Sequence, residues 1–180
     1  MNLRKLNEEV FIAEDPIVQI GDDQIVFLKQ QAGASPRKRA RICAHKSNDD
    51  ALHEMVIAIA ASSYIHPHKH LQKSESFHIV EGNVDVAVFD DVGNVIDVVE
   101  LGTAGSGRRF FYRLSPGAFH TLLVRSDFIV MHEVTNGPFT SGGTALAPFA
   151  PSEDRTMEVG EYIKRTSDLV ARHLQFKKST

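Results

Sequence analysis

Hydrophobic and polar positions alternate through most of the middle of the chain. Short apolar runs such as EMVIAIAAS, VDVAVF and FHTLLV are separated by turn-forming stretches such as DDVGN and GTAGSG. About seven or eight short strands at this spacing are typical of a sandwich or a barrel. The pattern therefore predicts a mainly β domain over residues 36–147.

The two ends of the chain show a different periodicity. In residues 1–35, apolar stripes in LRKLNEEVFIA and DDQIVFLKQQA have helical spacing, and Asp22 and Asp23 offer an N-cap. In residues 148–180, a proline-rich stretch leads into an amphipathic helical pattern. Its predicted buried face consists of Tyr162, Ile163, Leu169, Val170 and Leu174. We therefore expect one β-domain with helical extensions at both ends.

Composition and charge narrow the class of partner. The 180 residues are 42% hydrophobic, which is enough for a core, and the net charge of −3 creates no general attraction for nucleic acid or an anionic membrane. The single cysteine, Cys43, excludes an internal disulfide and is expected to be an inert core residue. No apolar run resembles a signal peptide or approaches the roughly 20 residues of a membrane span. We expect a cytoplasmic protein without a nucleic-acid or membrane partner.

Candidate chemistry is concentrated in HPHKHLQKSESFHIVEG, residues 66–82, which contains four of the nine histidines. Alternate residues of a strand share a face, so His68 and His70 would project together. Two neighbouring imidazoles need further ligands to hold one ion. After the turn LQKS, Glu75 can point back at the pair, and it shares its strand face with Phe77.

A fourth ligand is expected from SPGAFHTLLV, where His120 begins an apolar strand after a proline-glycine turn. Three imidazoles and a carboxylate suit one divalent transition metal, such as Fe, Zn, Ni or Mn. The sequence therefore predicts a metal site made of His68, His70, Glu75 and His120. The remaining histidines nearby, His66 and His78, are interpreted as rim and outer-face residues.

This ligand pattern resembles the cupin superfamily. The first cupin motif, HxH followed by a glutamate and a later glycine, is matched by His68, His70, Glu75 and Gly82. Pairing His66 with His68 instead would require a glutamate near position 73, where the sequence has lysine. The resemblance implies a double-stranded β-helix, which is a jelly-roll barrel, with the metal held by these ligands.

The second cupin motif is matched only by Gly117 and His120. Its other positions are departures that affect turn residues and a non-ligand position, so the ligand itself is retained. The departing residues are Ser62, Arg109, Ser115 and Val124.

A narrower resemblance covers most of the chain. Six separated blocks, among them SPRKRARICAH, LHEMVIAI and HEVTNGPF, are similar to the WbuC family of cupin-fold metalloproteins, which are small bacterial proteins named from O-antigen polysaccharide gene clusters. The resemblance implies a fold and a metal site, and it suggests a link to surface-polysaccharide synthesis. Cupins frequently dimerise by sheet contact, so a homodimer is also expected.

A second group of candidates comes from the cationic stretch RKRARICAH. Strand alternation places Arg39, Arg41 and His45 on one face together with Cys43. The stretch could be a solvated edge strand, or its arginines could enter the barrel and bind a carboxylate or phosphate. Further candidates for holding an acidic group are Lys73 and Arg113, and the candidates for proton transfer are Glu133 and Tyr64.

These features lead to three hypotheses for function. The first is a metal-dependent enzyme, an isomerase or epimerase or a dioxygenase, that acts on a small anionic molecule such as a sugar or sugar phosphate. The second is a non-catalytic sensor in which the metal helps to bind a small molecule. The third is a metal used only for structure, which predicts a closed coordination sphere.

Overall fold

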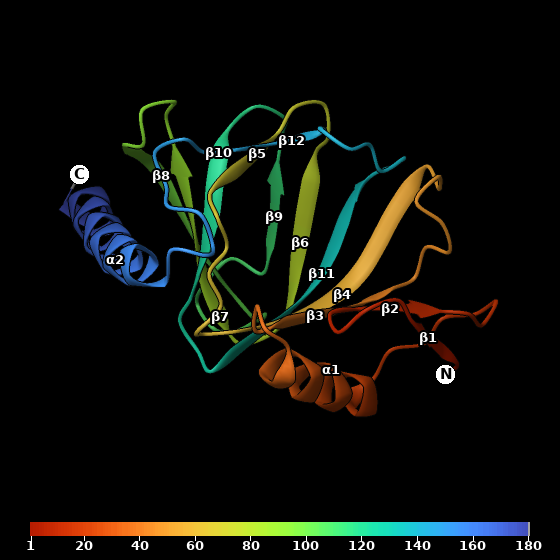
Figure 1. Cartoon of the computed structure of the whole chain (residues 1–180). Coiled ribbons are helices and arrows are strands. Elements are labelled where there is room, and N and C mark those ends of the chain that lie inside the picture. The colour runs from red at the N-terminus through yellow and green to blue at the C-terminus, as the bar shows by residue number, and fades with distance from the viewer. Residues whose placement is uncertain (180) are drawn as a thin grey trace.

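The fold consists of two β-sheets packed face to face, with a helix on the outside of each (Figure 1). The structure is a computed structural model that describes residues 1–179. The strands are β1 (Leu3–Lys5), β2 (Val10–Ala13), β3 (Arg39–Cys43), β4 (Leu52–Ala60), β5 (His68–His70), β6 (Glu75–Glu81), β7 (Asn83–Phe89), β8 (Val95–Gly102), β9 (Phe111–Leu114), β10 (Phe119–Val124), β11 (Phe128–Asn136) and β12 (Thr144–Leu146). The helices are α1 (Asp22–Ala34) and α2 (Thr156–Ser179).

Eight of the strands form a jelly roll. The large sheet has the order β1-β2-β3-β4-β11-β6-β9, and the small sheet has the order β12-β5-β10-β7-β8. From β4 to β11 the chain crosses between the sheets at every step except the β7–β8 hairpin. This is the strand order of a double-stranded β-helix. The fold predicted from the sequence is therefore confirmed.

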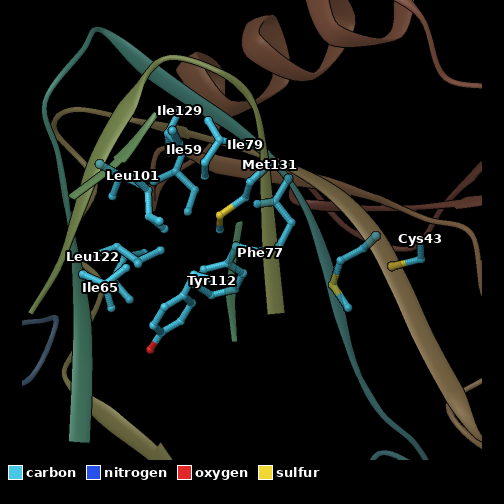
Figure 2. Packing of buried hydrophobic residues seen from close by; sticks show 14 of the residues in the cluster. Cys43, Ile59, Ile65, Phe77, Ile79, Leu101, Tyr112, Leu122, Ile129 and Met131 are labelled. Atoms are coloured by element: carbon cyan, nitrogen blue, oxygen red, sulfur yellow. The ribbon is translucent and has the colours of Figure 1, made fainter. Parts of the chain in front are cut away.

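The interior changes character along the barrel. On β6 the buried positions are Glu75, Phe77 and Ile79, in strict alternation with more exposed ones. Figure 2 shows Ile79 grouped with Ile59 and Ile129, and Phe77 beside Tyr112. Because Glu75 and Ile79 are four residues apart, about 13 Å along the strand, the aliphatic core fills one end of the barrel and Glu75 lies toward the other.

The expectation that the N-terminal extension is helical throughout is wrong for its first part. Residues 3–13 contain β1 and β2, and β2 pairs in parallel with β3 at the side of the large sheet. The apolar run of β2 is buried on both faces, since Phe11 packs against the helix side and Ile12 against the barrel core. A doubly buried strand has no alternation, so its apolar residues resembled a helical stripe.

The predicted helix in the second part of this extension is present as α1. Its N-cap is Gly21 rather than Asp22 or Asp23, and the Gly21 N–H donates to the side-chain oxygen of Gln24 at 2.9 Å. The two aspartates lie in the first turn, where their negative charges interact favourably with the positive end of the helix dipole. The fully buried Leu28 packs α1 against the outside of β3 and β4, below the large sheet in Figure 1.

The C-terminal helix is confirmed. Of its predicted apolar face, Tyr162 and Val170 are buried. Ile163 and Leu174 are partly buried and pack against the apolar cluster that contains Val170. This face covers the outer side of the small sheet near β8. Within residues 1–179, neither α1 nor α2 combines the length and the apolarity of a membrane-spanning helix.

Candidate metal centre

Four potential metal ligands meet between the two sheets at one end of the barrel. His68 and His70 come from β5 and His120 from β10, all in the small sheet. Glu75 is the first residue of β6 in the large sheet. Their ligand atoms all lie within 4.8 Å of one another. Two ligands on opposite sides of one ion are about 4.2 Å apart, twice a metal–nitrogen bond, so the set has close to the dimensions of a coordination sphere.

Strand pairing explains this convergence. His120 is directly opposite His68 in the antiparallel pair of β10 and β5, and their ring centroids are 4.5 Å apart. His70, two residues further along β5, has its ring centroid 5.1 Å from that of His68. The turn after β5 then reverses the chain, and the alternation of β6 turns Glu75 inward with Phe77.

Backbone carbonyls orient two of the imidazoles. Nδ1 of His68 lies 2.9 Å from the carbonyl oxygen of His66, and Nδ1 of His120 lies 3.2 Å from that of Ala118. A carbonyl only accepts, so each Nδ1 carries the proton and donates it. In the neutral rings, Nε2 is then the lone-pair atom that faces the site, as a metal-ligating histidine requires.

The contacts of Glu75 suit a bound cation. Its buried Oε1 is 2.8 Å from Nε2 of His120 but has no hydrogen bond of acceptable geometry to any of residues 1–179. Its Oε2 is 3.0 Å from Nε2 of His70, whose Nδ1 lies 3.1 Å from Oγ1 of Thr144. Burial opposes protonation of His120, but its contact with Glu75 outweighs burial and raises the pKa of His120, because a positive charge at Nε2 relieves the repulsion between its lone pair and the carboxylate. A metal ion between them would replace this repulsion with two attractions, so the residues fit the group that the cupin resemblance implies.

The protonation states also suit a metal ligand set. Burial lowers the pKa of His68 to about 4, so its ring is neutral at physiological pH. Burial opposes ionisation of Glu75, but its contacts with His120 and His70 outweigh that effect and lower its pKa to about 2. Metal binding needs neutral imidazole and ionised carboxylate. His68 and Glu75 are already in these states, whereas a metal would displace the proton that Glu75 favours on His120.

The four side chains face a cavity of about 460 Å³, a size that suits a small ligand. Figure 2 shows interior side chains facing each other, with Ile65 and Leu122 on one side and Ile59, Phe77 and Met131 on the other. Ile65 lies in the connection between β4 and β5. The apolar side chains that line the cavity include Ile57, Ile59, Ile65, Phe77, Leu122 and Met131. Part of the cavity wall outside the histidine cluster is therefore apolar.

Two of the predicted anion-binding residues line this cavity. β3 pairs with β2 on one side and β4 on the other, so the alternative interpretation as an edge strand is wrong. Ala40 and Ile42 face the α1 side, and the opposite parity turns Arg39 and Arg41 into the cavity. The cationic face of this strand therefore lies inside the barrel.

The structure does not bring His45 into the cavity. The strand ends at Cys43, and His45 instead stacks on His53 with ring centroids 4.2 Å apart. Burial lowers the pKa of His45. Cys43 is buried as expected, and burial raises its pKa to about 11, which makes it an unreactive thiol.

Three other predicted residues also lie outside the cavity. Lys73 donates to the carbonyl oxygen of Pro138 at 2.5 Å in a rim loop. Arg113 follows the buried Tyr112 and so points outward. The hydroxyl of Tyr64 donates to the carbonyl oxygen of Pro151 at 2.9 Å, on the side of the barrel covered by α2.

Glu133 is the predicted acid–base residue that lines the cavity. It is opposite Phe77 in the β11–β6 pair and therefore diagonal to Glu75, with Cα atoms about 7–8 Å apart. Burial and the negative charge of Glu75 raise the pKa of Glu133 to about 7. Glu133 can therefore exchange a proton near neutral pH.

Sequence reasoning missed several residues of this site. His66, interpreted as a rim residue, is buried and lines the cavity, whereas His78 is exposed on the outer face as expected. Thr144 contacts His70 from β12, and Glu153 lies at the cavity mouth. Thr144 and Glu153 are distant from the motifs in sequence, and no local pattern marks them.

Comparisons with known proteins found one family model and several similar solved structures. A family model described as a domain of unknown function (DUF6016) matches residues 20–101. No curated protein matches the sequence. The X-ray structure of protein SO0799 from Shewanella oneidensis is similar with a TM-score of 0.54 and 16% identity, over 72% of this chain and 85% of that protein.

Two further solved structures are less similar. An uncharacterized conserved protein with a double-stranded beta-helix domain from Klebsiella pneumoniae has a TM-score of 0.47 and 16% identity, over 63% of this chain and 87% of that one. The cupin domain of Cnp3 from Schizosaccharomyces pombe has a TM-score of 0.43 and 14% identity, over 55% of this chain and 64% of that one. The likeness to SO0799, at 16% identity, concerns the fold alone.

A ligand substitution should abolish metal binding. We expect His120→Ala to lose at least about 100-fold in affinity for a divalent transition metal, because it removes a buried ligand. The matched control is His78→Ala, which removes an exposed histidine of the outer face and should retain wild-type affinity. Metal content by plasma mass spectrometry, on variants with wild-type circular dichroism, measures both. Equal metal content in the two variants would contradict the assignment.

The raised pKa of Glu133 predicts a pH-dependent cost in stability. Below about pH 4.5 the carboxyl is protonated in both folded and unfolded chains. Above about pH 7 only the folded state bears the cost of a charge that is partly buried and lies near Glu75. In metal-free protein, Glu133→Gln should therefore be more stable than wild type by about 1–3 kcal/mol near pH 8, and the gain should vanish near pH 4.

Urea unfolding at the two pH values measures this difference. Glu161→Gln, on the exposed side of α2, is the control and should change stability equally little at both. A Glu133→Gln protein no more stable than wild type near pH 8 would show that Glu133 is not a buried, costly charge.

Proposed function

We propose that the protein is a metal-dependent enzyme that acts on a small anionic molecule. The observation that carries this proposal is the convergence of three imidazoles and one carboxylate on a cavity that Arg39, Arg41 and Glu133 also line. A purely structural site would need no adjoining cavity with an acid–base group. One divalent ion, such as Fe, Zn, Ni or Mn, is the cofactor that this ligand set suits.

The roles of the residues follow from their chemistry. A bound divalent ion would supply Lewis acidity that polarises a substrate oxygen, or a site for dioxygen if it is iron. Three neutral imidazoles and Glu75 leave such a centre at a net charge of +1, which favours an anion. Arg39 and Arg41 would hold the acidic group of the substrate, and a carboxylate oxygen of Glu133 would accept or return a proton.

The finer features of this proposal come from the sequence and from its resemblances to cupins and to the WbuC family. They are a bacterial origin, a cytoplasmic location, a homodimer, and action on a sugar or sugar phosphate in surface-polysaccharide (O-antigen) synthesis. An isomerase or epimerase would use Glu133 to move a proton on carbon, whereas a dioxygenase would depend on the metal for oxygen chemistry. The two reaction types differ in whether dioxygen is consumed.

A second candidate is a non-catalytic sensor that binds the same molecule. The position of Tyr64 favours it, because this hydroxyl is bonded to the Pro151 carbonyl outside the cavity. Of the two acid–base candidates, only Glu133 then remains beside the metal ligands. Under this alternative the ligand binds and leaves unchanged.

A substrate screen distinguishes the two candidates. Protein loaded separately with each of the four metals would be incubated with sugar phosphates and organic acids in deuterated water, and followed by NMR and by an oxygen electrode. We expect turnover with one metal, and a loss of about 10²–10⁴-fold in rate in Glu133→Gln with binding retained. Glu54→Gln, a partly exposed glutamate of β4, should keep the wild-type rate. Binding without turnover under every metal would favour the sensor and contradict the enzyme.

A further inference from the structure

The mouth of the cavity contains an unevenly paired group of charges. Arg37 forms a close ion pair with Glu9. Its Nε lies 3.0 and 2.9 Å from the two carboxylate oxygens, and its Nη2 lies 2.5 Å from Oε2. These hydrogen bonds outweigh burial and lower the pKa of Glu9. Arg37 and Glu9 therefore form a satisfied structural pair. Arg39, two residues further along, is in a different situation.

Arg39 makes only part of the bonds that its guanidinium offers. Its Nη2 donates to Oε1 of Glu153 at 2.9 Å, while its Nε is enclosed and has no hydrogen-bond partner within residues 1–179. A guanidinium binds a carboxylate best through two parallel bonds from one edge. Glu153 thus occupies Arg39 with a single bond, although the side chain of Arg39 is only 16% exposed. A buried donor without a partner is costly.

A ligand carboxylate could replace Glu153 as the partner of Arg39. It belongs to the segment between β12 and α2, outside any regular element, and its side chain is 39% exposed. It lines the same cavity as the metal ligands and lies 3.8 Å from Arg37 as well. A carboxylate is therefore already present at the mouth, held by one exposed side chain of the protein itself.

Apolar side chains form a continuous strip of the wall beside Arg39, although Arg41 and Glu133 also line the cavity. Ile59 is opposite Arg39 in the β3–β4 pair, Ile57 is opposite Arg41, and Met131 is opposite Ile57 in the β4–β11 pair. A ligand that spans the cavity must lie along these side chains. Sugar hydroxyls placed against this apolar strip would lose hydrogen bonds to water that its side chains cannot replace, whereas hydrocarbon would gain from burial there.

Taking the cavity of the proposed function as the binding site, we infer that its ligand is a small carboxylic acid with an apolar carbon skeleton, whose carboxylate replaces Glu153 on Arg39. The ligand would pair both Nε and Nη2 of Arg39 and lay its skeleton against the isoleucines and Met131. This deepens the proposed function by favouring an organic acid over a sugar phosphate.

Calorimetric titration of metal-loaded protein tests the substrate class. The probes are pyruvate, ketoleucine and phenylpyruvate, which share one 2-oxo acid group and differ in apolar skeleton, together with glucose 6-phosphate. We expect ketoleucine or phenylpyruvate to bind at least about 10-fold more tightly than pyruvate, because each buries additional apolar surface. Glucose 6-phosphate binding as tightly as these acids, or no binding by any acid, would overturn the inference.

Two substitutions test the exchange at Arg39. Glu153→Gln removes the internal competitor and should tighten phenylpyruvate binding at least about 3-fold, whereas Arg39→Met should weaken it at least about 10-fold. Glu158→Gln, an exposed glutamate of the nearby helix, is the control and should leave affinity unchanged. Arg39→Lys keeps the charge but lacks the fork, so it should also bind weakly. Unchanged affinity in Glu153→Gln would refute the displacement.

The outcomes separate this inference from the proposed function. Turnover of a sugar phosphate by the metal-loaded protein would leave the enzyme proposal intact and overturn the acid ligand. Acid binding that follows the expected pattern, without turnover under any metal, would support the ligand class and contradict the enzyme. Wild-type metal content in Arg39→Met would confirm that its weaker binding arises at the mouth and not from a disrupted metal site.

Discussion

The short contacts between Glu75 and the imidazoles of His70 and His120 determine what this barrel can do. The carboxylate is ionised and buried, and the carbonyl of Ala118 fixes the His120 ring so that its lone pair faces the carboxylate. The Glu75 carboxylate and a lone pair of His120, 2.8 Å apart and buried, are stable together only when a positive charge lies between them. A proton can supply that charge, but three imidazoles and one carboxylate around a common point suit a divalent metal better.

The rest of the structure places this contact and gives it an environment. The jelly-roll crossing brings β5 and β10 of one sheet against the start of β6 in the other, so no ligand depends on a flexible loop. The N-terminal strands and α1 enclose β3, which turns Arg39 and Arg41 toward the same interior. The result is a polar centre at one end of a partly apolar cavity and a cationic strand beside its mouth.

The sequence predicted the parts of this arrangement that depend on local spacing. The HxH pair, the turn to Glu75 and the strand parity of β6 are short-range features, and they led to the four residues that the structure brings together. Parity also separated Arg39 and Arg41 from Ala40 and Ile42. The same parity argument gave a wrong position for His45, because the strand ends two residues before it at Cys43 and the sequence pattern does not mark that boundary. Long-range pairings, such as β2 with β3 and Glu153 with Arg39, left no local signal.

X-ray absorption at the edge of the bound metal tests the central claim most directly. The account predicts three imidazole nitrogens and at least one carboxylate oxygen at about 2.0–2.2 Å, with a total coordination number above four because the cavity leaves positions open. A four-coordinate closed shell would assign the metal to structure alone. A sulfur ligand, or fewer than three imidazoles, would contradict the ligand set itself.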